Sequence, residues 1–134
     1  MRYSNTFKQT TTMNELIDLN RSNKFAAANK KNVETQAIAK QVSDAPSFDS
    51  QVYVCFEFTY KNSQADLDNV QSSKKSVLDG LVAAKVLKQD NFNWVKPISF
   101  DVFKKADEKL VTVHIFDDKH EYLDFVNYLL SVYS

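Results

Sequence analysis

Residues 51–60 read QVYVCFEFTY, and this stretch decides the fold because apolar side chains recur at every second position. Alternate side chains of a strand point to the same side of a sheet, so the run predicts a strand with one buried face. The residues on that face are Val52, Val54, Phe56, Phe58 and Tyr60. Residues 65–80, ADLDNVQSSKKSVLDG, follow and lead into an apolar run, so we expect a helix from Asn69 to about Ala84.

Two further strands and a helix are expected on the C-terminal side. Residues 92–105, FNWVKPISFDVFKK, and residues 109–118, KLVTVHIFDD, have the composition of strands, and the short ADE segment between them predicts a hairpin. Residues 119–133, KHEYLDFVNYLLSVY, predict an amphipathic helix. Its apolar face is expected to carry Leu123, Val126, Leu130 and Tyr133.

The N-terminal part is predicted to be largely helical. Residues 12–42 lack Gly and Pro, and Thr12 with Glu15 matches a capping box at a helix start. A break is expected near residues 20–23, which are polar and rich in Asn. Residues 1–11 fit either an edge strand or an irregular start. The order helix, strand, helix, strand, strand, helix predicts a single α+β domain over residues 1–134, with a small mixed sheet flanked by helices.

Composition excludes several classes of protein. The chain of 134 residues has a single Gly, so it lacks the glycines of the Walker and Rossmann phosphate-binding loops. The single cysteine, Cys55, lies in the apolar strand and is expected to be a buried thiol. No leader peptide and no apolar run of membrane-spanning length is visible, so we expect a soluble, cytoplasmic protein without membrane contact.

Charge is balanced overall but unevenly distributed. Lysine and arginine number 17, as do aspartate and glutamate, which is unlike the basic balance of most nucleic-acid-binding proteins. Residues 107–134 hold six acids and two lysines, a local charge of −4, and the rest of the chain therefore carries +4. The body of the molecule is thus more basic than its C-terminal part.

The acids that follow the strand suggest a metal site. Asp66 and Asp68 are two residues apart, and in extended backbone such a pair points to one side, where two carboxylates suit Mg²⁺. The alternative is structural, with Asp68 capping the helix and Asp66 stabilising a turn. Lys75 and Asp79 form an i, i+4 pair of opposite charge on the helix, and a short returning loop would bring Asp90 beside the first two acids. Three carboxylates and a lysine would suit phosphodiester chemistry.

The stretch DLDNVQSSKKSVLDGLVAAKVLKQDN, residues 66–91, resembles the core of the RusA family of Holliday-junction resolvases. That pattern is Asp-x-Asp-Asn, a lysine, Leu/Phe-Asp-Gly/Ala-Leu and a later Asp. Residues 13–31, MNELIDLNRSNKFAAANKK, are similar to the N-terminal region of RusA-like proteins from Gram-positive phages, so the resemblance covers residues 13–116. It implies a homodimeric, Mg²⁺-dependent endodeoxyribonuclease, with Mn²⁺ as a possible substitute. Such an enzyme cuts four-way DNA junctions in paired strands in the cytoplasm of a bacterial host or lysogen.

Site residues are carried over by position. The resemblance implies that Asp66, Asp68 and Asp90 bind the metal and that Lys75 is the catalytic lysine. Lys74 is the alternative, because the segment between the Asp-x-Asp-Asn motif and the Leu-Asp-Gly-Leu motif is longer than in the family. Where the family often has Gly in the following loop, this chain has Lys85. The residues expected to contact DNA are Asn14, Arg21, Lys24, Lys30, Lys31, Asn69 and Lys74.

Other polar and aromatic residues fit structural roles better. His114 lies in an alternating strand and is expected to be structural, and no Ser/His/Asp arrangement is indicated, because no Gly-flanked serine occurs. Phe92, Trp94 and Phe100 are expected in the core, with Phe92 alternatively wedged against an unstacked base near Asp90.

Two further readings remain beside the resolvase. The first is a catalytically degenerate RusA-like module that binds DNA or protein, because Lys61 alone stands where the family usually has several basic residues before the first Asp. The second is a small α+β interaction module in which the acids are caps and turn formers.

Overall fold

The computed structural model describes residues 1–8, 24–61 and 67–133, with backbone alone at residues 24–31, 67–72 and 99. Seven elements follow in the order β1 (Arg2–Lys8), α2 (Lys24–Gln41), β2 (Val52–Tyr60), α3 (Leu67–Ala83), β3 (Val95–Lys105), β4 (Leu110–Phe116) and α4 (Lys119–Tyr133). The predicted α+β class is confirmed. None of the helices among these residues is long and apolar enough to cross a membrane.

The strands in the described part of the chain form one mixed four-stranded sheet in the order β1-β4-β2-β3. β4 pairs antiparallel with both β1 and β2, whereas β3 pairs parallel with β2. The predicted hairpin between residues 92–105 and 109–118 is therefore wrong. Parallel neighbours need a crossover connection, and α3 supplies it, so β3 lies on the far side of β2 from β4.

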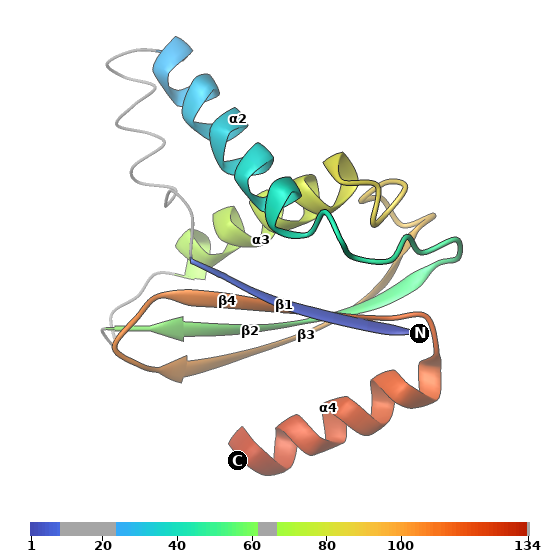
Figure 1. Ribbon diagram of the computed structural model, residues 1–134. Coiled ribbons are helices and arrows are strands. Elements are labelled where there is room, and N and C mark those ends of the chain that lie inside the picture. The colour runs from blue at the N-terminus through green and yellow to red at the C-terminus, as the bar shows by residue number, and fades with distance from the viewer. Residues whose placement is uncertain (9–23, 62–66, 134) are drawn as a thin grey trace.

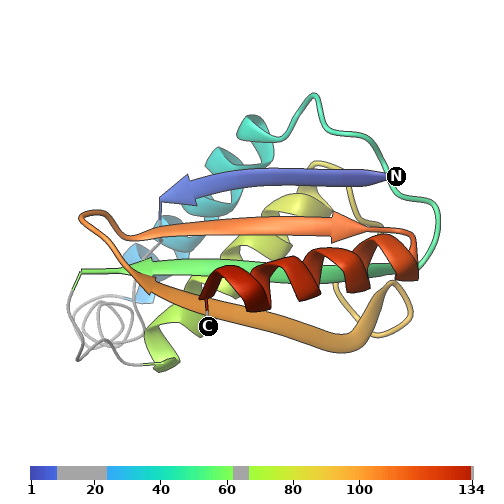
Figure 2. The same cartoon turned by 90° about the horizontal axis from the view of Figure 1, so that it is seen from below.

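Helices cover both faces of the sheet. α2 and α3 pack against each other on one face, and α4 crosses the opposite face (Figures 1 and 2). Both faces of β2 are consequently buried, which differs from the predicted single buried face. Phe56 and Phe58 point into the main core under α2 and α3, and Cys55 is fully buried in the smaller core under α4.

The close packing of α2 on α3 depends on Gly80. A Cβ atom at this position would lie 2.3 Å from Cγ2 of Ile38 on α2, so any larger residue would push the two helices apart. The backbone of α3 can approach Ile38 of α2 closely because Gly80 has no side chain. This contact fixes the position of the helix that carries Lys75.

α4 begins and ends at the predicted residues, 119 and 133, but its buried face matches the prediction only in part, because Val126 and Tyr133 pack against the smaller core and the two predicted leucines do not. Tyr122 and Leu129 are the buried side chains, whereas Leu123 and Leu130 are 43% and 51% exposed. The reason is aromatic packing: the ring of Tyr122 stacks on Tyr53 at 5.1 Å and meets the edge of Phe116 at 5.8 Å. These rings pull the face containing Tyr122 onto the sheet.

Candidate functional site

Lys75 lies between two carboxylates on the outer side of α3. Its ammonium is 2.6 Å from Oδ2 of Asp90 and 3.0 Å from Oδ1 of Asp79, one helical turn further along α3. The lysine side chain is 58% exposed, and both aspartates are about half as exposed. The loop that follows the helix therefore brings Asp90 back beside Lys75 on α3.

These contacts favour the charged forms of Lys75 and Asp90. Hydrogen bonds to Asp90 and then to Asp79 raise the pKa of Lys75 above its usual value. In turn the hydrogen bond from Lys75 lowers the pKa of Asp90. Lys75 is thus held by one carboxylate from its own helix and one from the returning loop.

The returning loop starts at the end of α3, where Lys85 takes a left-handed conformation with φ of 62°. The Val86 N–H donates to the Leu81 carbonyl at 2.9 Å, and the Lys85 N–H donates to the Val82 carbonyl at 3.0 Å. This pair of bonds is a Schellman motif, which satisfies the last carbonyls of the helix and reverses the chain. Gly is the usual residue at such a position.

Further bonds hold the loop against β2. The N–H groups of Trp94 and Val95 both donate to the Asn91 carbonyl. Gln51 donates its side-chain amide to the Phe92 carbonyl at 2.7 Å, and the Val52 N–H donates to the Trp94 carbonyl. Asp90 is thus positioned by a loop whose backbone is hydrogen-bonded at several points.

The two adjacent lysines point to different surroundings. Lys74 makes an ion pair of 3.0 Å with Asp101 on β3, and its ammonium lies 5.2 Å from the centre of the Phe56 ring. Both partners of this pair are largely shielded from solvent. Lys75, in contrast, is 58% exposed, so its ammonium is the more accessible of the two.

Several predicted site residues lie outside the described part of the chain. Asp66, Asn14 and Arg21 are not described, and Asp68, Asn69, Lys24, Lys30 and Lys31 are described by backbone alone. Position 68 is in the first turn of α3, seven residues before Lys75, a separation of about 10 Å along the helix axis. The convergence of the three acids stays a prediction.

The donor chemistry suits a hard cation. Asp79 and Asp90 supply carboxylate oxygens, the ligands that Mg²⁺ and Mn²⁺ take in proteins. Within residues 1–8, 24–61 and 67–133, no group of three or more His, Cys, Asp or Glu side chains is close enough to hold a metal ion. The carboxylates of Asp66 and Asp68 are not among the side chains that the structure describes, so their contribution to a site here stays a prediction.

A second polar cluster, not predicted from the sequence, lies under α4. Ser4 on β1 is 2.6 Å from Nδ1 of His114 on β4, whose Nε2 is 2.5 Å from Oε2 of Glu57 on β2. The Tyr133 hydroxyl donates to the other oxygen of Glu57 at 2.9 Å. The sequence gives one sign of this cluster, which is Glu57, a charged residue within the largely apolar strand β2. Its partners, up to 76 residues away along the chain, could be found only from strand order.

This cluster has the hydroxyl, imidazole and carboxylate of a nucleophilic triad, but its setting differs. Ser4 sits in the middle of a regularly paired strand, opposite His114, rather than on a turn where backbone N–H groups converge. The hydrogen bonds join three strands and the end of α4. We therefore assign this chain of bonds a structural role, in agreement with the expectation for His114.

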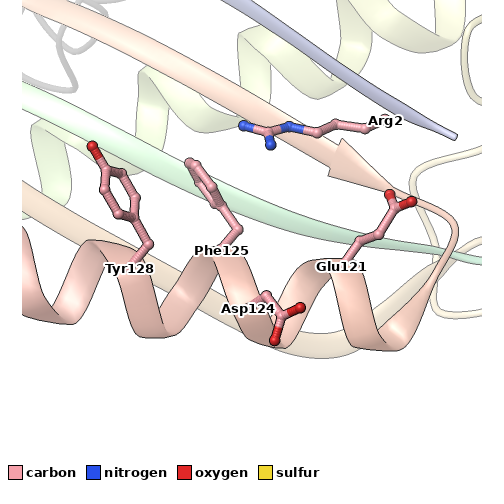
Figure 3. Close-up of a pocket in the computed structure, with 5 residues that line it drawn as sticks. All are labelled: Arg2, Glu121, Asp124, Phe125 and Tyr128. Carbon is pink, nitrogen blue, oxygen red and sulfur yellow. The ribbon is translucent and has the colours of Figure 1, made fainter.

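An open groove of about 620 Å³ lies next to this cluster, between β1 and α4 (Figure 3). The guanidinium of Arg2 lies 4.5 Å from the centre of the Phe125 ring and 5.2 Å from that of Phe116. Acidic and aromatic side chains of α4 form the rest of the lining. They are Glu121, Asp124, Phe125 and Tyr128. The groove is thus on the opposite face of the sheet from Lys75.

Comparison with known proteins adds no family assignment. No protein-family model matches the chain, and no curated protein matches its sequence.

Proposed function

We propose that this protein is a Mg²⁺-dependent endodeoxyribonuclease of the RusA type, which resolves four-way DNA junctions by paired symmetric cuts. The observation that carries the proposal is the position of Lys75, whose ammonium lies 2.6 Å from Asp90 after a helix and a returning loop. The resemblance of residues 66–91 gives these two residues the catalytic roles. The remaining acids of the motif are close to the start of the same helix: Asp66 directly precedes α3 in the sequence, and Asp68 is its second residue.

In this proposal Asp66, Asp68 and Asp90 would hold the metal, which supplies polarisation of the scissile phosphate and activation of a water molecule. Lys75 would contact the phosphate and offset the negative charge that develops on the leaving oxygen. Its raised pKa keeps the ammonium charged at neutral pH, and its exposure leaves it open to DNA. The low pKa of Asp90 keeps that carboxylate ionised.

Resolution of a junction requires two symmetric cuts, so the active form would be a two-fold homodimer that presents one site for each strand. The bacterial cytoplasm, of the host or of a lysogen, is the compartment where such DNA occurs. The residues expected to position the DNA backbone are Asn14, Arg21, Lys24, Lys30, Lys31, Asn69 and Lys74. Of these, Lys74 is paired with Asp101, so it would contact DNA only after leaving that ion pair.

A catalytically degenerate protein that binds DNA is the second candidate. The observation that favours it is that Lys75 pairs with both nearby carboxylates, a stable arrangement without any metal. Lys61 is also the only basic residue in the segment before Asp66, and each lost phosphate contact lowers DNA affinity.

Cleavage of a synthetic four-way junction in Mg²⁺ tests these proposals, with the wild type compared with Asp68→Asn and Asp90→Asn. We expect paired, symmetric nicks by the wild type and a loss of at least a hundredfold in each variant. Asp124→Asn, an exposed change on α4, is the matched control and should cut normally. Binding without cleavage by the wild type, in Mg²⁺ and in Mn²⁺, would favour the degenerate protein. A wild type that neither binds nor cleaves the junction would reject both candidate functions.

A further inference from the structure

A pocket of about 270 Å³ opens beside Asp90, between α3, β2 and the start of β3. Its walls are mainly apolar, and two of the charged side chains of this region, Asp90 and Lys74, reach it. The other lining residues are Val54, Phe56, Leu78, Phe92, Val95, Lys96, Pro97 and Ile98. An apolar pocket with a few polar groups at its edge is the usual form of a site for a small flat molecule.

The rim of this pocket carries exposed apolar side chains. Phe92 is 74% exposed and Ile98 is 57% exposed, so the prediction that Phe92 belongs to the core is wrong. The cause is the loop, because the bond from Gln51 to the Phe92 carbonyl and the turn closed at Asn91 hold this backbone in place with the ring outside. The protein therefore presents an aromatic ring on a fixed loop, two residues from Asp90.

We propose that this pocket receives one unstacked base of the DNA strand that is cut, with the ring of Phe92 stacked on the base. The inference rests on the proposed function and adds the part of the substrate that is recognised. Base faces stack on aromatic rings, and extruded bases are held between aromatic and apolar side chains. Asp90 offers an acceptor to the polar edge of the base, and Lys74 would add a donor once it leaves its ion pair with Asp101.

Charge also favours a base that belongs to a nucleic acid strand. A base in the pocket brings its own phosphate to the rim, where Lys75 is exposed. Lys96 lines the pocket, and among the described residues no carboxylate forms an ion pair with it. Its ammonium lies 5.6 Å from the centre of the Tyr53 ring, and it would leave that contact to reach a neighbouring phosphate of the same strand.

The test is junction binding with Ca²⁺ in place of Mg²⁺, which keeps the DNA intact, for the wild type, Phe92→Ala and Phe92→Tyr. Loss of one stacked base should weaken binding by roughly 5- to 150-fold in Phe92→Ala, whereas Phe92→Tyr should retain affinity. Tyr128→Ala is the matched control, because Tyr128 is an aromatic residue of similar exposure, 60%, on α4. It should bind as the wild type does.

A second variant separates a base in the pocket from a ring that merely wedges into the junction. Leu78→Phe narrows the pocket and leaves Phe92 in place, and it should also weaken binding severalfold while the circular dichroism spectrum stays that of the wild type. Full affinity of Phe92→Ala, or of Leu78→Phe, in a protein that binds and cuts junctions would overturn the pocket proposal alone. Absence of DNA binding by the wild type would overturn the proposed function together with it.

Discussion

His114 is held at both ring nitrogens in the space between the sheet and α4. A carboxylate oxygen accepts hydrogen bonds, so Nε2 of the neutral ring donates to Glu57, and Nδ1 accepts from the Ser4 hydroxyl. Burial lowers the pKa of His114, and this effect exceeds the opposing effect of Glu57. The imidazole is therefore neutral at pH 7 and resists protonation in the folded protein.

This depressed pKa predicts that stability falls on acidification between pH 7.5 and 5.5. In that range the unfolded chain binds more protons at His114 than the folded chain does, so the free energy of unfolding rises with pH. Each unit by which the pKa is lowered contributes about 1.4 kcal/mol. Urea unfolding at both pH values measures the difference.

The variant His114→Gln keeps a donor for Glu57 but cannot titrate. It should be less stable than the wild type at pH 7.5 and should show a weaker dependence on pH. Of the other described groups with displaced pKa values, the N-terminal amine, whose pKa is raised from 8.0, begins to titrate in this range, so the contribution of His114 is the difference between the slopes of the wild type and the variant. An unchanged slope in the variant would contradict the assignment.

At the scale of elements, the end of α3 shows a residue in a costly conformation. Lys85 is the one non-glycine residue with positive φ in the described part of the chain. A side chain at a left-handed position strains the backbone, and the Schellman bonds of Val86 and Lys85 hold it there.

Lys85→Gly should therefore stabilise the protein by about 0.5–1 kcal/mol, because relief of the strain exceeds the added flexibility of the unfolded chain. The Lys85 side chain is exposed, so its removal breaks no buried packing. The Ser47 hydroxyl donates to the backbone carbonyl of residue 85, and this hydrogen bond is kept in the variant. Ala83→Gly, in the last turn of α3, is the control and should destabilise by a similar amount. The midpoints of urea unfolding distinguish the two variants. A loss of stability in both would contradict the claim that the backbone at Lys85 is strained.

The sequence predicted most elements but fewer of their contacts. The alternation of residues 52–60 identified β2, and the apolar periodicity of residues 119–133 identified α4, because local pattern determines local structure. The hairpin failed because two strands that are neighbours in the chain lie on opposite sides of β2. The buried face of α4 was predicted only in part, because Tyr122 and Leu129, rather than Leu123 and Leu130, are buried above Cys55.

The candidate site divides in the same way. The i, i+4 spacing predicted the pair of Lys75 with Asp79, which is confirmed. The returning loop was expected to bring Asp90 beside Asp66 and Asp68; it brings Asp90 beside Lys75, and its approach to the two acids stays a prediction. The exposure of Phe92 and the chain from Ser4 to Glu57 depend on strand order and on loop hydrogen bonds. No pattern within a few residues carries that information.

At the scale of the whole molecule, the sheet separates two cores, and α4 alone covers the smaller one in the described part of the chain (Figure 2). Cys55 lies at the bottom of this second core and has no exposed surface. Burial raises the pKa of its thiol to about 12, so the reactive thiolate is scarce while α4 is in place.

The rate at which a thiol reagent modifies Cys55 therefore reports the packing of α4. The wild type should react very slowly with a disulfide reagent under native conditions. Leu129→Ala removes a buried contact of α4 and should accelerate the reaction at least tenfold, because roughly 2–5 kcal/mol of packing is lost. Leu130→Ala, the exposed neighbour, should react like the wild type. Equal rates in the two variants would show that α4 does not control access.

The position of β4 has a consequence for synthesis on the ribosome. β1, at residues 2–8, has β4, at residues 110–116, as its partner in the sheet, and β4 also joins the pair of β2 and β3. At translation rates of about 5–20 residues per second, β1 waits roughly 5–20 s for the strand that it needs. During that interval Phe7 and the edges of two unfinished strands are open to other chains. The yield of folded protein should therefore depend on what protects the nascent chain until its last strand emerges.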